Sequence, residues 1–141
     1  MQAQVVTGDI DPFIGTGGHG HSHPSASMPF GMVQLGPDSR QEGWDGCSGY
    51  HYSDSTLYGF SHTHLSGTGV ADYNDIQFRP HLMGEDLSQP SPFIKSSESS
   101  AAGFYAVTLS NGIQVSLTAS ERMGLQKIQF PKGQRALVQL D

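Results

Sequence analysis

Residues 105–119 alternate between apolar and polar side chains, and this pattern constrains the fold more than any other part of the sequence. Apolar residues occupy every second position in two runs, Tyr105 to Leu109 and Ile113 to Ala119. Spacing by two places side chains on one face of a strand. Between the runs stands Asn111-Gly112, which tolerates the positive φ angles of a type I′ turn. The sequence therefore predicts a two-stranded hairpin with one apolar and one polar face.

The segment that follows the hairpin changes phase. Met123 and Leu125 share one parity, whereas Ile128 and Phe130 share the other. A β-bulge or a turn near Gln126-Lys127 would bring both apolar pairs onto one face.

A turn at Pro131-Lys132-Gly133 is predicted to lead into a last strand over Ala136 to Leu140, and the sequence stops at Asp141. A strand needs a neighbour, so we expect this chain of 141 residues to be part of a larger domain. A carboxy-terminal edge strand is the alternative.

The first half also reads as short strands joined by long loops. Phe30 to Leu35 is an apolar run that we expect to end at Gly36-Pro37-Asp38, and Ile76 to Phe78 is another that we expect to end at Pro80. Residues 84–103 are rich in Ser, Pro and Gly and are predicted to form a loop. Since no amphipathic helix of four turns is evident, the predicted class is an all-β sandwich of antiparallel strands.

The amino-acid composition limits the classes of molecule that the chain could bind. The net charge is −6, no basic stretch is present, and only 14% of residues are charged, which argues against a nucleic-acid surface. Low charge together with many Ser, Thr, Gln, His and Gly residues suits neutral polar ligands such as sugars. No stretch reaches the roughly 18 apolar residues of a membrane span. Ala3-Gln4 could be the remnant of a removed export signal.

Residues 11–75 carry the residues suited to binding. This stretch holds six of the seven histidines, the only Trp and the only Cys, in blocks punctuated by glycine. Such polar sequence usually lines a binding surface.

The histidines suggest a metal site but do not define one. His19, His21 and His23 are spaced by two, as are His62 and His64, and on a strand that spacing would let two imidazoles grip a transition metal. Glycines between the first three make a strand doubtful, and no further Cys or Glu cluster supplies other ligands. Histidines that hydrogen-bond loops, or that contact a sugar directly, are the alternatives.

Trp44 and Asp45 form a candidate sugar site. An indole between Gly43 and Asp45 on a polar loop is well placed to stack on a pyranose ring, and the carboxylate of Asp45 can accept hydroxyl hydrogen bonds. Asp54, Asp72 and Asp75 could complete a carboxylate pair for glycoside hydrolysis, but the sequence selects no such pair.

Three blocks of the sequence resemble the amino-terminal region of glycoside hydrolase family 92. They are DPFIGTGGHGH at residues 11–21 with PFGMVQL at 29–35, GWDGCSGYHY at 43–52, and GFSHTHLSGTG at 59–69. The resemblance covers residues 10 to 141. Ser25 and His23 depart from the pattern, as does Gln126, and the first two put fine specificity in doubt.

The resemblance implies a calcium-dependent, inverting exo-α-mannosidase that acts on mannose-containing glycans and is secreted or periplasmic. Residues 1–141 would be part of its amino-terminal β-sandwich, of the supersandwich type. The catalytic acid, the catalytic base and the calcium ligands would lie on a helical toroid domain absent from this chain, so no catalytic or metal-binding residue is expected here. Trp44 would wall the subsite next to the scissile bond, with Asp45, Cys47 and His19 as further substrate-binding candidates.

Two functions of other classes stay open at this point. A free-standing carbohydrate-binding module would bind sugar without catalysis, and a small histidine metalloenzyme would hold zinc, iron or copper.

Overall fold

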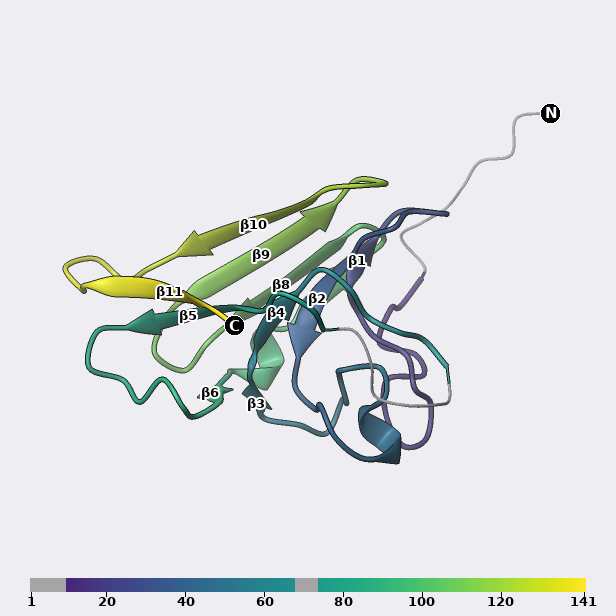
Figure 1. Ribbon diagram of the computed structural model, residues 1–141, viewed down its shortest axis with the longest axis horizontal. Coiled ribbons are helices and arrows are strands. Elements are labelled where there is room, and N and C mark those ends of the chain that lie inside the picture. Colours follow the sequence, from purple (N-terminus) through teal and green to yellow (C-terminus); the bar gives the residue numbers. More distant parts are fainter. Residues whose placement is uncertain (1–9, 68–73) are drawn as a thin grey trace.

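The computed structural model describes residues 10–67 and 74–141, and in this part the chain is an antiparallel β-sandwich (Figure 1). One sheet has the strand order β1-β2-β4-β5-β11 and the facing sheet has the order β10-β9-β8-β7, while β3 and β6 form a small ribbon. The predicted all-β class is confirmed. The strands are β1 (Ala26–Ser27), β2 (Gln34–Asp38), β3 (Thr56–Leu57), β4 (Gly59–Ser61), β5 (Phe78–Leu82), β6 (Ser91–Pro92), β7 (Ser99–Ala101), β8 (Phe104–Thr108), β9 (Gln114–Ala119), β10 (Gly124–Gln129) and β11 (Ala136–Leu140).

The predicted hairpin is present as β8 and β9. Tyr105 pairs with Leu117 and Val107 pairs with Val115, so their side chains share the inward face and are almost fully buried. The turn differs from the prediction: among the hairpin loop residues only Gly112 has a positive φ, of 87°, and Gly112 N–H bonds to Leu109 O at 2.9 Å. A type I′ turn needs positive φ at both central residues, so the loop is a longer turn closed by one left-handed glycine.

The expected bulge near Gln126-Lys127 is wrong. β10 pairs with β9 without interruption, from Gly124 opposite Ala119 to Gln129 opposite Gln114. The phase change arises because Leu125 lies on the outer face of the sheet, where it is exposed, as is Met123 in the preceding turn. The apolar side chains therefore lie on both faces of this edge strand.

The two strand ends predicted at proline are also wrong, since β2 includes Pro37 and β5 includes Pro80. Gln77 exchanges both backbone hydrogen bonds with Asp141, and antiparallel ladders alternate bonded and non-bonded pairs. Pro80 therefore falls at a non-bonded pair with β11, and its nitrogen faces the β4 side, where pairing stops at Phe78. A missing N–H costs nothing at such a position.

The loop predicted for residues 84–103 contains more structure than expected. It includes β6 and β7 and a short 3₁₀-helix, η3 (Lys95–Ser97). In the part of the chain that the structure describes, helix is limited to η3 and η2 (Trp44–Gly46). The absence of a long helix was predicted, and no described helix is long and apolar enough to cross a membrane.

The hydrophobic core lies between the two sheets. Side chains from the inner faces of both sheets meet there, and Phe13, Leu82, Ala119, Ile128 and Phe130 pack at its margin. The buried members are Ala26, Val33, Leu35, Leu57, Phe60, Phe93, Tyr105, Val107, Leu109, Ile113, Val115 and Leu117.

Candidate functional site

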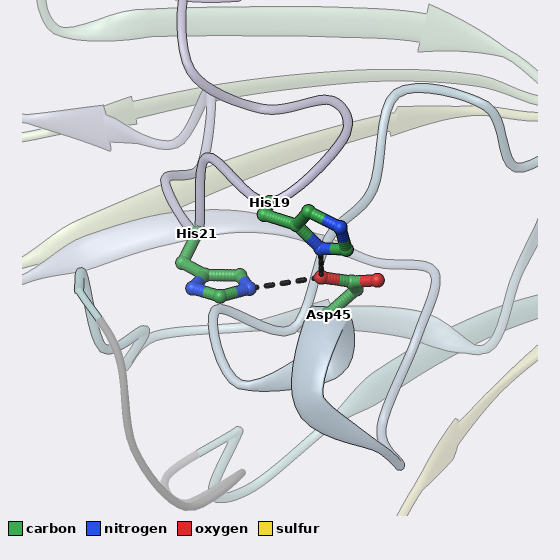
Figure 2. Close-up of side chains that lie close together, drawn as sticks. All are labelled: His19, His21 and Asp45. Carbon is green, nitrogen blue, oxygen red and sulfur yellow. Dashed lines mark hydrogen bonds and ion pairs between the residues drawn. The ribbon is translucent and has the colours of Figure 1, made fainter.

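Two loops bring His19, His21 and Asp45 together (Figure 2). His19 and His21 come from the glycine-rich loop before β1, and Asp45 comes from η2. His19 Nδ1 lies 2.7 Å and His21 Nε2 lies 3.0 Å from the same oxygen, Asp45 Oδ1. Both ring nitrogens therefore carry a proton and donate to this carboxylate.

The loop that carries the two histidines has a strongly constrained backbone. Gly20 N–H bonds to Gly17 O, and Ser22 N–H bonds to Gly15 O. A Cβ on Gly20 would lie 2.0 Å from Gly15 O, so only glycine fits there. His21 has a φ of 53°, a left-handed conformation that is uncommon for a residue with a side chain and concentrates at functional sites.

Backbone and side-chain bonds join this loop to its two neighbours. Tyr52 N–H donates to Thr16 O at 2.8 Å, and His51 Nε2 lies 3.0 Å from Gly18 O. Gly67 N–H donates to His21 O at 2.8 Å. The three glycine-rich blocks of the sequence therefore form one unit in the fold.

The charge state of Asp45 is set by the same contacts. Hydrogen bonds from His19 and then from His21 lower the pKa of Asp45 below its usual value. The carboxyl group is thus ionised near neutral pH, and about a quarter of the side chain is open to solvent.

Trp44 stands beside the carboxylate and faces solvent. Its side chain is 57% exposed, and its ring meets the His21 ring edge to face, with centroids 5.2 Å apart. His21 is buried under this contact. An exposed indole braced by a buried ring offers a preorganised stacking surface next to a charged acceptor.

Cys47 lies behind this group and not in it. Its side chain is buried, and Sγ contacts Gly67 O at 3.0 Å. The thiol ties the η2 loop to the third glycine-rich block, so we assign Cys47 to the support of the site and leave it out of the surface that a ligand would meet.

The other histidines of the motif region do not join the cluster. His64 is fully buried and donates through Nε2 to Asp38 Oδ1 at 2.8 Å and through Nδ1 to Gln34 O at 2.8 Å. Because both nitrogens face oxygens that only accept, His64 is an imidazolium. Burial opposes the charge, but the bond to Asp38 prevails and raises the pKa of His64.

The pKa of His23, which lies beside His64, shifts in the opposite direction. Its ring centroid lies 5.2 Å from that of His64, and its Nε2 contacts Ser66 Oγ at 3.2 Å. Burial, and then the nearby charge of His64, lower the pKa of His23 to about 3.

The spacing of His19, His21 and His23 by two does not place the three side chains on one face, because the chain turns at residues 17–21 instead of forming a strand.

The aromatic residues after Cys47 separate into two environments. Tyr50 is buried, and its hydroxyl donates to Glu98 Oε1 at 2.9 Å, so its ring is not open to a ligand. Tyr52 is half exposed, and Lys95 Nζ lies 4.1 Å above its ring centroid.

Of the substrate-binding residues predicted from the sequence, Trp44, Asp45 and His19 lie in one cluster, which also contains His21; their contact with a sugar stays a prediction. The sequence offered a signal for His21 in the HGH spacing, but it could not separate His21 from His23. Of the candidate carboxylates, Asp54 forms an ion pair with Arg40 and Asp75 accepts from Thr63 at 3.3 Å. Asp72, residues 68–69 of the third block and residues 3–4 lie outside the described residues.

Comparison with known families gives a match over nearly the whole sequence. Residues 9–141 match the glycosyl hydrolase family 92 N-terminal domain. An uncharacterized secreted glycosidase from Arthroderma benhamiae is 30% identical in an alignment 132 residues long, which covers 86% of this chain and 17% of that protein.

Solved structures agree with this match. The family GH92 α-mannosidase BT3965 from Bacteroides thetaiotaomicron, in complex with mannoimidazole, superposes with a TM-score of 0.87 at 34% identity, over 96% of this chain and 20% of that one. The family GH92 inverting mannosidase BT2199 of the same bacterium gives a TM-score of 0.71 at 28% identity, over 87% of this chain and 17% of that one. The chain thus spans about a fifth of the length of these relatives.

Proposed function

The chain belongs to the family of glycosyl hydrolase family 92 N-terminal domains, and from this premise we propose that it is the sugar-facing domain of an inverting exo-α-mannosidase. The observation that carries the proposal is the exposed Trp44 ring beside the charged Asp45. The parent protein removes terminal α-mannose from glycans outside the cytoplasm. Mannosidase structures among the relatives, and a relative named as a secreted glycosidase, support this reading.

The residues of this chain bind and orient the sugar and do not break the bond. The Trp44 ring packs against the C–H face of a pyranose, and Asp45 Oδ2 accepts hydrogen bonds from hydroxyl groups. Asp45 is fixed in position because Oδ1 is already held by His19 and His21. The rigid loop therefore limits the entropy lost when the sugar is ordered.

Calcium is proposed to bind outside this chain. A calcium ion takes six to eight oxygen ligands, whereas the described cluster of possible metal ligands has two imidazoles and one carboxylate. These residues do not fit calcium. A calcium ion held elsewhere in the parent would polarise sugar hydroxyls, and the catalytic acid and base would also come from elsewhere.

The exposed apolar side chains near the β9–β10 turn are the proposed contact surface for the catalytic domain. Met32 N–H donates to Glu121 O at 2.7 Å, so the loop carrying Phe30 and Met32 lies against the turn carrying Met123. Phe30 is fully exposed in a left-handed conformation, and Met32 and Met123 are exposed as well. Contiguous exposed apolar groups mark interaction sites. Because relatives are about five times longer than the matched region, the rest of the parent chain is the natural partner.

The test of the proposed function is the kinetics of the parent protein on an aryl α-mannoside. Trp44→Ala should lower kcat/KM by roughly 10- to 100-fold, equivalent to about 1.4 to 2.8 kcal/mol, and Trp44→Phe should restore part of it. Tyr52→Ala is the control, since Tyr52 is an exposed ring outside the cluster. Equal kcat/KM for Trp44→Ala and the unaltered protein would overturn the proposal.

The proposed contact surface for the catalytic domain is tested by measuring the Tm of the parent protein. Phe30→Asp should lower the Tm of the parent protein, because a charge would then be buried against the partner domain. Lys132→Asp, a charge change in an exposed turn, should leave the Tm nearly unchanged. An unchanged Tm for Phe30→Asp would show that this face stays open to solvent.

A further inference from the structure

We propose that His19, His21 and Asp45 form a binding site for a first-row transition metal ion, most readily zinc. This is a second activity of the chain, distinct from calcium and from hydrolysis. The three donor atoms, His19 Nδ1, His21 Nε2 and Asp45 Oδ1, lie within 4.8 Å of one another. Among the described residues, no other group of three possible ligands converges in this way.

The donor set fits zinc chemistry. Imidazole nitrogen together with one carboxylate oxygen suits zinc, nickel or copper and not calcium or magnesium. Zinc is usually tetrahedral with nitrogen and oxygen ligands at about 2.0–2.1 Å, so its donors lie about 3.3 Å apart. The two nitrogens now lie 2.7 and 3.0 Å from the oxygen. Opening each contact by a few tenths of an ångström would admit the ion once each imidazole carries its proton on its other ring nitrogen, His19 Nε2 and His21 Nδ1, so that the nitrogen facing Asp45 offers a lone pair to the metal.

The fold supplies both rigidity and access. His21 is held by its left-handed backbone, by burial and by the Trp44 ring, so one ligand is fixed. His19 has a side chain 82% exposed to solvent, so it can rotate to meet the ion. Because His19 and Asp45 are open to solvent on one side, water or another ligand could take a fourth position on the ion.

The metal and the sugar would compete for Asp45. This consequence rests on the proposed function, in which the Asp45 carboxylate accepts sugar hydroxyls. A zinc ion on Oδ1 would withdraw charge from the carboxylate and crowd the face of Trp44. Zinc is therefore expected to act as a reversible inhibitor at this site.

The test is a calorimetric titration of the parent protein with zinc chloride, in buffer that contains calcium so that oxygen-rich sites are filled. The unaltered protein should bind one more zinc per chain than His19→Ala does. His21→Ala and Asp45→Asn should weaken that zinc by at least the ~10–100-fold that loss of an outer-shell partner costs. His62 lies outside the cluster, with its ring tilted against that of Phe78, so His62→Gln should bind zinc as the unaltered protein does.

The outcomes separate the metal site from the sugar site. Equal zinc binding in His19→Ala and in the unaltered protein would overturn the metal site, and because His19 is exposed this variant does not depend on refolding of the core. Zinc that binds at this site and raises KM for the mannoside supports both proposals. Zinc that binds there and leaves KM unchanged would keep the metal site and contradict the placement of the sugar on Asp45.

Discussion

The β8–β9 hairpin and the three glycine-rich loops are two parts of one domain that obtain their geometry in different ways. In the hairpin, buried side chains at alternate positions determine which face points inward, and neighbours in sequence are neighbours in space. In the loops, positions are set by contacts between distant residues, such as His21 with Asp45 and Cys47 with Gly67. A local sequence pattern therefore predicts the structure of the hairpin. For the loops, the sequence reveals only which residue types they contain.

The loops depend on a buried ion pair, and breaking it is the largest effect we expect. Asp38 is fully buried and accepts from His64, from Ser61 Oγ at 2.8 Å and from Gln77 Nε2 at 2.7 Å. Asp38→Asn leaves the His64 charge without its partner and should lower the free energy of unfolding by about 3–5 kcal/mol. Urea unfolding measures it. A loss below about 1 kcal/mol would mean that His64 is not held as a cation.

The hairpin should respond to the loss of apolar volume and not to the loss of charge. Leu117→Ala leaves a cavity opposite Tyr105 in the core and should lower the free energy of unfolding by roughly 2–5 kcal/mol. Gln114→Ala, on the outer face of the same strand, should change it by less than about 0.5 kcal/mol. Similar losses in both variants would contradict the inward alternation.

A matched pair of glycines tests the rigidity of the histidine loop. Gly20→Ala would drive a methyl group into Gly15 O, whereas a Cβ on Gly17 meets nothing closer than 3.6 Å. Gly20→Ala should therefore displace the histidines and lower kcat/KM of the parent about tenfold or more, while Gly17→Ala should change it little. If the two variants behave alike, the backbone at Gly20 is not what positions the site.

Sequence reasoning reached the hairpin, the last strand and the antiparallel sandwich because each rests on a local pattern. It also selected Trp44, Asp45 and His19, which lie together in the fold, because their residue types and the family motif indicate sugar contact, and that contact stays a prediction. It failed at Pro37 and Pro80, each of which has a strand partner on one side only, and at Leu125, whose exposure no periodicity reveals. It could not separate His21 from His23, because the turn between them depends on contacts with distant loops.

His23 and His64, which are neighbours in the fold, should give the smallest effects on stability. Their contributions should depend on pH in opposite directions. The pKa of His64 is raised above 6.5, so its stabilising contribution is present below pH 6.5 and is lost as the pH rises through the raised value. The pKa of His23 is lowered to about 3. In the unfolded chain His23 takes up a proton near pH 6.5, whereas in the folded protein it stays neutral until the pH approaches 3. The free energy of unfolding therefore falls as the pH drops from 6.5 toward 3.

Urea midpoints measured across this range for the unaltered protein, His23→Gln and His64→Gln resolve the two contributions. His23→Gln should lessen the loss of stability on the acid side, and His64→Gln should lessen the loss on the alkaline side. Identical pH profiles for all three proteins would contradict both assignments.

The central claim is that the loops around Trp44 face the sugar, and a crystal structure of the parent protein with a bound mannoside tests it most directly. We predict that the indole of Trp44 stacks on the pyranose, with a sugar hydroxyl within hydrogen-bond distance of Asp45. A sugar bound in the catalytic pocket with Trp44 and Asp45 both out of contact would contradict it.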